Sequence, residues 1–219
     1  MRVRHHLEAS RYNRMGMNGN VPGWGDDTLG GMTVLAEKHR VIYSKARIQA
    51  RVKELAEEIA ADYRDRVPYL VVVLKGATIF ASDLIRNLPL PLELDFFGIS
   101  SYGSESRSTG VVRITKDLDS TIESKHVLVV EDIVDSGQTL NYLMNTLRTR
   151  RPASLKVVSF LDRPDRREVD VKIDYMGFAI PDAFVLGYGM DYREKYRNVP
   201  YIFVLDRLPD GEELLTLSP

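Results

Sequence analysis

The sequence predicts an α/β fold built on a central, mainly parallel sheet that is flanked by helices. Residues 69–74 and 127–130 form short, continuously apolar runs rich in Val, which is typical of strands buried on both faces of a parallel sheet. The second run is followed by a helical pattern from 137 to 150 and by another apolar run at 155–161. Strand, helix and strand at this spacing predict a right-handed βαβ unit.

The other elements follow from local patterns along the chain. Ser44 is a good N-cap for a helix whose apolar residues recur at three- and four-residue spacing, namely Ile48, Val52, Leu55, Ala56 and Ile59. Lys75-Gly76 predicts the end of strand 69–74, and a helix follows at 77–87. Further strands are expected at 92–100, 111–115, 183–186 and 201–205. The polar, glycine-flanked residues 101–110 are expected to be mobile.

Residues 1–31 differ in composition from the rest of the chain. They are rich in Gly, Asn and Arg and lack periodic apolar residues, which predicts a poorly ordered N-terminal extension before a single domain at 32–219. The basic character of this segment is compatible with an organelle-targeting peptide, but Asp26 and Asp27 weigh against that interpretation. A start codon assigned too far upstream is an alternative, because Met32 directly precedes the folded pattern.

The bulk composition excludes several classes of function. The 219 residues are 44% hydrophobic and 28% charged, as in a globular protein, and the net charge of −1 gives no general attraction to nucleic acid or anionic membranes. The sequence contains no cysteine, which excludes disulfides and thiolate zinc sites. No apolar run approaches the length of a membrane span. We therefore expect a cytoplasmic protein that binds neither nucleic acid nor membrane.

The most informative segment is 127–140, where a buried strand leads into an acidic turn. Glu131, Asp132 and Asp135 are followed at once by a loop that offers two hydroxyls, a flexible glycine and the N–H groups of a helix start, namely Ser136, Gly137, Gln138 and Thr139. Such a loop suits a phosphate, whereas the carboxylates suit hydroxyls or magnesium. A ribose 5-phosphate with a metal-bound diol meets both needs. The alternative is an acidic first turn that only complements the helix dipole.

At these residues the sequence resembles the type I phosphoribosyltransferases, whose signature is an apolar run, two acids and an acid-[ST]-G-x-T loop. Further segments resemble the hypoxanthine-guanine phosphoribosyltransferases of purine salvage, over about residues 35 to 207. The resemblance implies a small hood subdomain beside the core. It also implies transfer of a phosphoribosyl group from phosphoribosyl pyrophosphate to a 6-oxopurine base, with Mg²⁺ as cofactor and a homodimer or homotetramer as the assembly.

The resemblance also assigns roles to residues. Glu131 and Asp132 would bind the ribose hydroxyls and magnesium, and residues 136–139 the 5-phosphate. Pyrophosphate would be bound by Arg197 and by the segment Leu74-Lys75-Gly76 with its residues Lys75 and Gly76, which in the family contacts pyrophosphate through an unusual cis peptide. Asp191 would lie near a second magnesium, Ser101 and Tyr102 would open a lid, and Asp135 would be the catalytic residue that handles a proton of the purine five-membered ring.

For the purine, the resemblance implies that Phe184 stacks on the ring and that the backbone of Val185 reads its edge. The chain departs from the family at Arg163, where a lysine usually donates to the 6-oxo group. Arginine is longer and planar, so the preference among hypoxanthine, guanine and xanthine is open. Two other interpretations are an RNA-binding regulator with a phosphoribosyltransferase fold and an inactive paralogue.

Overall fold

The computed structural model describes residues 28–29, 32–33, 39–101 and 112–205, and the chain divides into two units at residues 1–36 and 37–219. In the first unit, β1 (Thr28–Leu29) pairs antiparallel with β2 (Met32–Thr33), a pairing that the sequence analysis did not predict. Most of the predicted N-terminal extension lies outside the described residues. The predicted mobile segment lies outside them too, except for Ser101.

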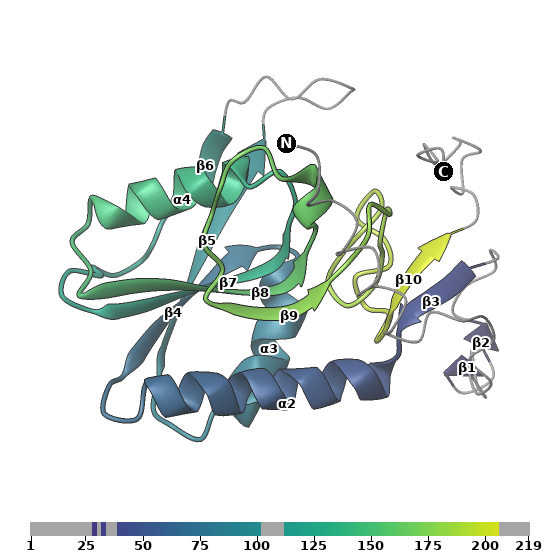
Figure 1. Cartoon of the computed structure of the whole chain (residues 1–219), viewed down its shortest axis with the longest axis horizontal. Helices are drawn as coiled ribbons and strands as arrows, with labels where there is room; N and C mark the ends of the chain where they lie inside the picture. The colour runs from purple at the N-terminus through teal and green to yellow at the C-terminus, as the bar shows by residue number, and fades with distance from the viewer. Residues whose placement is uncertain (1–27, 30–31, 34–38, 102–111, 206–219) are drawn as a thin grey trace, which may run out of the picture. The chain divides into compact units, whose positions relative to one another are not determined.

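The second unit contains the predicted α/β core, a six-stranded sheet in the order β6-β5-β4-β7-β8-β9 (Figure 1). Its strands are β4 (Pro68–Leu74), β5 (Glu93–Ser101), β6 (Val112–Lys116), β7 (His126–Val134), β8 (Ser154–Asp162) and β9 (Tyr175–Ala179). All neighbouring pairs are parallel except β5 and β6. The predicted mainly parallel sheet is therefore confirmed.

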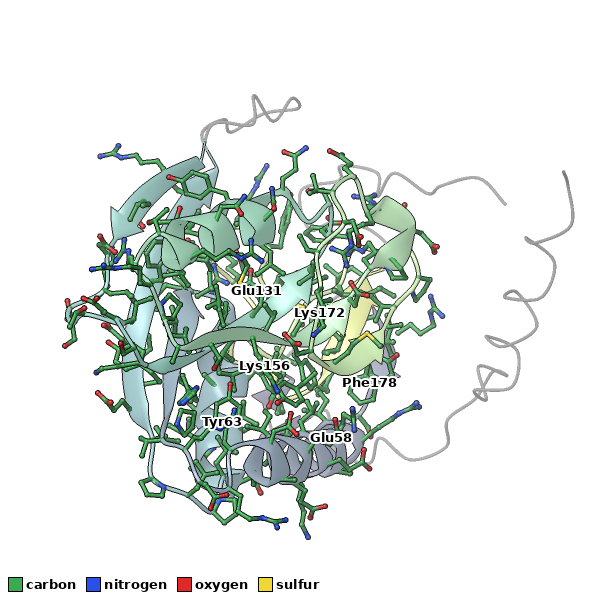
Figure 2. All side chains as sticks on the ribbon, turned by 60° about the vertical axis from the view of Figure 1, so that its left-hand side comes forward. Glu58, Tyr63, Glu131, Lys156, Lys172 and Phe178 are labelled. Atoms are coloured by element: carbon green, nitrogen blue, oxygen red, sulfur yellow. The ribbon has the colours of Figure 1, made fainter. Side chains whose placement is uncertain are left out.

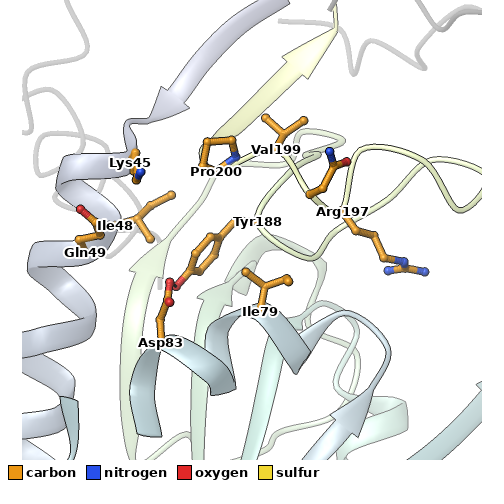
Figure 3. A pocket seen from close by; sticks show the side chains of 10 residues that line it. Lys45, Ile48, Gln49, Ile79, Asp83, Tyr188, Arg197, Val199 and Pro200 are labelled. Carbon is orange, nitrogen blue, oxygen red and sulfur yellow. Dashed lines mark hydrogen bonds between the residues drawn. The ribbon is translucent and has the colours of Figure 1, made fainter. Parts of the chain in front are cut away.

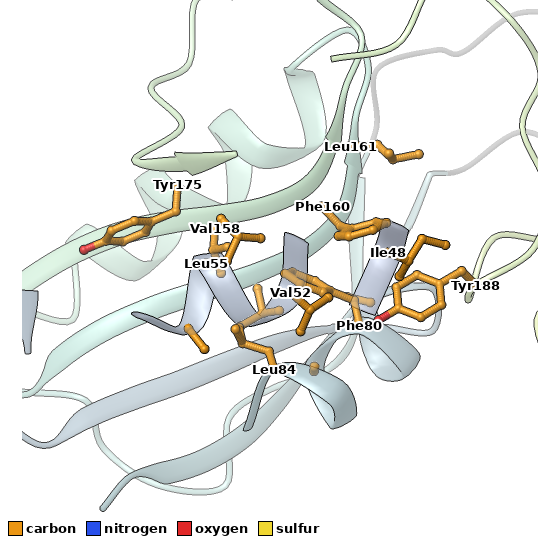
Figure 4. Close-up of a cluster of buried hydrophobic side chains, with 14 of the residues drawn as sticks. Ile48, Val52, Leu55, Phe80, Leu84, Val158, Phe160, Leu161, Tyr175 and Tyr188 are labelled. Carbon is orange, nitrogen blue, oxygen red and sulfur yellow. The ribbon is translucent and has the colours of Figure 1, made fainter. Parts of the chain in front are cut away.

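Helices cover both faces of this sheet. On one face lie α2 (Lys45–Asp62), which Ser44 caps as predicted, and α3 (Ala77–Asn87); α4 (Gln138–Arg148) lies on the other (Figure 1). Side chains along β4 point alternately to the two faces of the sheet, and each face carries its own hydrophobic core. Leu70 and Val72 pack with α2 and α3, while Val71 and Val73 pack with α4. Figure 4 shows the first of these cores, with Phe80 of α3 next to Phe160 of β8.

The acidic segment after Val130 is part of a strand, which corrects the predicted turn. β7 pairs with both neighbours up to Val130, and from Glu131 onward it continues to pair with β8 alone, as far as Val134. Glu131 therefore pairs with β8, and Asp132 lies between two residues of β7 that do so. α4 begins one residue later than predicted, at Gln138, because Gly137 adopts φ +84° and cannot be helical.

A second, two-stranded sheet joins β3 (His39–Tyr43) to β10 (Ile202–Leu205) and corresponds in place to the expected hood (Figure 1). The sequence analysis predicted β10 but missed β3, β9 and the short 3₁₀ helix η2 (Pro164–Arg166). The strand expected at 183–186 is wrong, since only Leu186 there forms an isolated bridge, to Phe203. Within the described ranges, no helix is long and apolar enough to cross a membrane.

Candidate active site

The predicted site residues gather at the carboxyl ends of the parallel strands. β4 ends at Leu74 and delivers Lys75-Gly76, β7 carries the acidic pair, and β8 ends at Asp162, next to Arg163. The peptide bond between Leu74 and Lys75 is cis, as the resemblance implied. In open α/β sheets this edge is where ligands bind.

Gly76 brings three chain segments into direct contact. A Cβ on Gly76 would lie 1.6 Å from Oδ2 of Asp132, and a Cβ on Gly189 would lie 2.1 Å from the carbonyl oxygen of Gly76. Neither position has room for a side chain. The Lys75-Gly76 segment is thus enclosed between the acidic strand and the loop that carries Asp191 and Arg197.

Glu131 is buried without a compensating cation, whereas Asp132 is half-buried and feels the charge of Arg197. Glu131 is 8% exposed, and its Oε2 has no hydrogen-bond partner among the described residues (Figure 2 labels this side chain). Burial, with a smaller contribution from the charge of Asp132, raises the pKa of Glu131 well above its usual range. Burial also raises the pKa of Asp132 to about 6, although the backbone N–H of Ile133 donates to Oδ1 at 2.8 Å. Two carboxylates in this state are ready to accept hydroxyls or a cation.

The loop at Ser136 to Thr139 has the conformation of an anion cradle. Gly137 stands at the start of α4 with positive φ, and Oγ of Ser136 accepts from the N–H of Gln138 at 3.4 Å. A Cβ on Gly137 would lie 2.6 Å from the carbonyl oxygen of Val169. The side chain of Gln138 donates to Glu168, and Thr139 is half-buried. The first turn of a helix leaves N–H groups without intrahelical partners, so the start of α4 favours a phosphate at this loop.

Asp135 is linked to Arg163 across the site. Nη1 of Arg163 lies 3.1 Å from Oδ2 of Asp135, and Nη2 donates to the carbonyl oxygen of Ala183 at 2.5 Å. Arg163 is 5% exposed, and neither its Nε nor Oδ1 of Asp135 has a hydrogen-bond partner among the described residues. The pair therefore keeps one buried donor and one buried acceptor for a ligand.

Two arginines that the sequence analysis did not select support Asp135. Nη1 of Arg166 lies 3.9 Å from Oδ2 of Asp135, and its Nε pairs with Asp182 at 2.5 Å. Arg167 donates to the backbone oxygen of Asp135 at 2.9 Å and pairs with Asp162. In the sequence, only the run of charged residues after Arg163 pointed to these contacts.

The two cations assigned to pyrophosphate are joined by a carboxylate. Nζ of Lys75 lies 2.9 Å from one oxygen of Glu194, and Nη2 of Arg197 lies 3.2 Å from the other. Arg197 also pairs with Asp191 at 2.8 Å, and the second oxygen of Asp191 accepts from the N–H of Glu194 at 2.8 Å. Glu194 was not predicted as a site residue.

The loop 187–199 that carries Asp191 and Arg197 is anchored to α3. The hydroxyl of Tyr188 donates to Asp83 at 2.8 Å, and Arg197 donates to the carbonyl oxygen of Gly189 at 2.8 Å. Figure 3 shows the ring of Tyr188 directed toward Asp83 and the guanidinium of Arg197 pointing away from the small pocket of about 120 Å³ that these residues line. The guanidinium therefore extends toward the acidic strand, where it lowers the pKa of Asp132 in opposition to burial.

On the purine side, Phe184 is 44% exposed and meets Tyr192 edge to face, whereas Val185 is buried. An exposed aromatic face beside Ala183, the residue that Arg163 contacts, is suited to stacking on a base. Ser101 ends β5 at the same edge of the sheet. Tyr102 lies outside the described residues, as does the predicted lid.

The donor set fits magnesium only together with a substrate. Among the described residues, no group of three or more His, Asp or Glu side chains is arranged to hold a metal ion. Magnesium commonly binds one or two carboxylates and completes its shell with water and substrate phosphates. The unpaired buried oxygen of Glu131, next to Asp132, fits that mode. Asp191 fits less directly, because both of its oxygens already have partners.

Comparisons with known proteins identify the family. Residues 41–193 match the family model described as phosphoribosyl transferase domain. The chain is 49% identical over 166 residues to the hypoxanthine-guanine phosphoribosyltransferase of Bacillus subtilis, covering 76% of this chain and 92% of that one. It is 51% identical over 172 residues to the enzyme of the same name from Mycobacterium avium, covering 76% and 85%.

A solved structure shows the same architecture. The crystal structure of a hypoxanthine phosphoribosyltransferase from Staphylococcus aureus has a TM-score of 0.73 to this chain at 45% identity, with 76% of this chain and 90% of that one covered. The comparisons of fold and of sequence thus agree. The chain belongs to the phosphoribosyl transferase domain family and, within it, to the hypoxanthine-guanine phosphoribosyltransferases.

Proposed function

We propose that the chain transfers the 5-phosphoribosyl group of phosphoribosyl pyrophosphate to hypoxanthine or guanine, giving the nucleotide IMP or GMP and pyrophosphate. The single observation that carries this proposal is the juxtaposition of three subsites at one sheet edge. These are the buried acidic pair on β7, the phosphate-type loop after it, and the Arg163–Ala183 contact beside the exposed ring of Phe184.

The donor half of the site would position the ribose and the departing pyrophosphate. Glu131 and Asp132 would accept from the ribose hydroxyls, while the loop 136–139 would bind the 5-phosphate. Lys75 and Arg197 would stabilise the negative charge that grows on the leaving group as the bond to the anomeric carbon breaks. Magnesium, on which the family typically relies, would be held by the acidic pair together with the donor, with Asp191 nearby, and would neutralise charge on the pyrophosphate.

The base half would position the purine and take up its proton. Arg163 holds one oxygen of Asp135, and the other oxygen, Oδ1, is buried and unpartnered among the described residues. Oδ1 would therefore accept the proton of the five-membered ring or stabilise the protonated ring. The buried guanidinium of Arg163 would donate to the 6-oxo group, Phe184 would stack on the ring, and the backbone of Val185 would bind its edge.

The remaining expectations belong to the same proposal. We propose a cytoplasmic enzyme that assembles as a homodimer or homotetramer and whose Ser101 and Tyr102 take part in closing the site. The sequence analysis also considered an RNA-binding regulator and an inactive paralogue. The buried acidic pair and the base half favour an enzyme, since a protein that only senses the donor has no need of Phe184 or Arg163.

The reaction itself can be tested by measuring pyrophosphate release with magnesium and phosphoribosyl pyrophosphate. Hypoxanthine, guanine, xanthine, adenine and uracil are supplied one at a time. We expect turnover with 6-oxopurines only. A folded protein that binds the donor and turns over none of the bases would support the regulator or the inactive paralogue, and salt-sensitive retention of RNA would identify the regulator.

Glu131→Gln is expected to raise the stability of the free protein and to weaken donor binding. The pKa of Glu131 is raised on folding, so its carboxylate destabilises the fold as pH rises above the unfolded value of about 4.3. Near pH 7.5 the variant should gain about 1–3 kcal/mol in free energy of unfolding, and the gain should shrink toward pH 4. Thermal unfolding at both pH values measures this. Glu57→Gln, an exposed position on α2, is the control, and an unchanged melting temperature for Glu131→Gln would contradict the prediction.

Asp135→Asn should lower kcat by about 10²- to 10⁴-fold, because an amide cannot take up the purine proton. The amide oxygen can still accept from Arg163, so the dissociation constant of phosphoribosyl pyrophosphate should change by less than about 3-fold. Steady-state kinetics and calorimetric titration separate the two quantities. Unchanged turnover would remove Asp135 from the catalytic role.

Arg163→Lys should change the ranking of the 6-oxopurines. One ammonium cannot reach both Asp135 and the carbonyl oxygen of Ala183, so the donor that faces the base is repositioned. We expect the ratio of kcat/KM for guanine to that for hypoxanthine to shift by about 3-fold or more. Arg151→Lys, on an exposed ion pair with Glu123, should leave the ratio unchanged. The same ratio in Arg163→Lys would exclude the side chain from base recognition.

A further inference from the structure

Glu194 occupies the space between the two cations that the proposed function assigns to pyrophosphate. Its two carboxylate oxygens are divided between them, with 2.9 Å to Nζ of Lys75 and 3.2 Å to Nη2 of Arg197. Lys75 and Glu194 lie 119 positions apart in the chain, so the contact joins the end of β4 to the loop 187–199. A single anion bridging these two cations reproduces the charge arrangement expected of a bound pyrophosphate.

The backbone around Glu194 holds its side chain in this place. The N–H of Glu194 donates to Oδ2 of Asp191 at 2.8 Å, and the isolated bridge between Tyr192 and Lys195 closes a tight turn around it. Arg193 and Glu194 have positive φ, at 50° and 65°. This turn is also fixed to the rest of the site, because Gly189 packs on Gly76 and the hydroxyl of Tyr188 donates to Asp83.

The interaction is weak enough to be displaced. The side chains of Lys75 and Glu194 are 66% and 63% exposed, and ion pairs in such positions contribute little to stability because solvent screens them. A pyrophosphate carries more charge than a carboxylate and would win the competition for both cations. Displacement of Glu194 thus frees Lys75 and removes one of the two carboxylates paired with Arg197, whose contact with Asp191 remains.

We propose that Glu194 is an internal competitor for pyrophosphate, which bridges Lys75 and Arg197 in the free enzyme and is displaced when the pyrophosphate group of the donor binds. The same carboxylate returns to the cations as pyrophosphate departs and so limits the affinity of the site for this product. The inference rests on the proposed roles of Lys75 and Arg197 in pyrophosphate binding. It assigns to Glu194 a role that requires no contact with the purine.

The test compares the wild type with Glu194→Gln. An amide bridges two cations poorly, so the variant should bind magnesium pyrophosphate about 2- to 10-fold more tightly and should lower the KM of phosphoribosyl pyrophosphate by a similar factor. The KM of hypoxanthine should not change. Calorimetric titration with magnesium pyrophosphate and steady-state kinetics measure these quantities. Unchanged or weaker pyrophosphate binding would overturn the proposal, and weaker binding would indicate that Glu194 helps to hold the ligand.

Two further variants serve as controls. One tests whether the effect depends on the bridge or only on the negative charge of Glu194, and the other tests whether removing any exposed ion pair has the same effect. Glu194→Asp keeps the charge but is one methylene too short to reach both cations, so it should also bind pyrophosphate more tightly than the wild type. If Glu194→Asp binds pyrophosphate with wild-type affinity while Glu194→Gln binds it more tightly, the negative charge alone explains the effect. That result would overturn the bridging argument. Glu123→Gln, which removes an exposed ion pair with Arg151, should match the wild type.

A separate variant tests the assignment on which this proposal rests, namely that Lys75 binds pyrophosphate. Lys75→Gln removes one of the two cations while leaving the acidic pair and the phosphate loop in place. If Lys75→Gln binds magnesium pyrophosphate as tightly as the wild type, then Lys75 does not bind the leaving group. If Lys75→Gln weakens binding and Glu194→Gln does not strengthen it, the assignment of Lys75 stands and only the competition by Glu194 is wrong.

Discussion

Three stretches of chain that are distant in the sequence meet at Gly76, where the backbone touches the carboxylate of Asp132 on one side and Gly189 on the other. The arrangement of the site depends on this contact. It fixes the separation between the end of β4, the acidic strand β7 and the loop that carries Asp191 and Arg197. Any side chain at Gly76 would force these segments apart, and the cations would no longer face the carboxylates.

The acidic pair is effective because it belongs to a strand. In a turn, Glu131 and Asp132 could rotate toward water and lose most of their attraction for a ligand. In β7, pairing with β8 continues through Val134, so the backbone beneath the carboxylates cannot relax. Their raised pKa values record the cost of keeping them desolvated. Such a site is costly to the free protein and is stabilised by a ligand that supplies hydroxyls and a cation.

The sequence predicted the core of the fold because its central strands are short, continuously apolar runs and the apolar residues of its helices have regular spacing. The prediction failed for segments whose secondary structure depends on tertiary contacts. The apolar run 183–186 resembles a strand, yet Arg163 binds the carbonyl oxygen of Ala183 and the segment stays irregular. β9 contains an interior glycine, Gly177, and is a strand because it pairs with β8. The motifs predicted which residues gather at the site, but the bridge from Lys75 to Glu194 spans 119 positions, and no local pattern contains it.

Arg163 shows how one departure from the family pattern can couple the two halves of the site. Asp135 directly precedes the phosphate-type loop, and Ala183 directly precedes the exposed ring of Phe184. The guanidinium contacts both, and its planar fork fixes the angle between its nitrogens. A lysine would contact one of them at a time and leave the other to find its own position. The arginine therefore sets the distance between the proposed donor and purine subsites through a single rigid group, and in the proposed reaction that distance would govern how closely the purine nitrogen approaches the anomeric carbon.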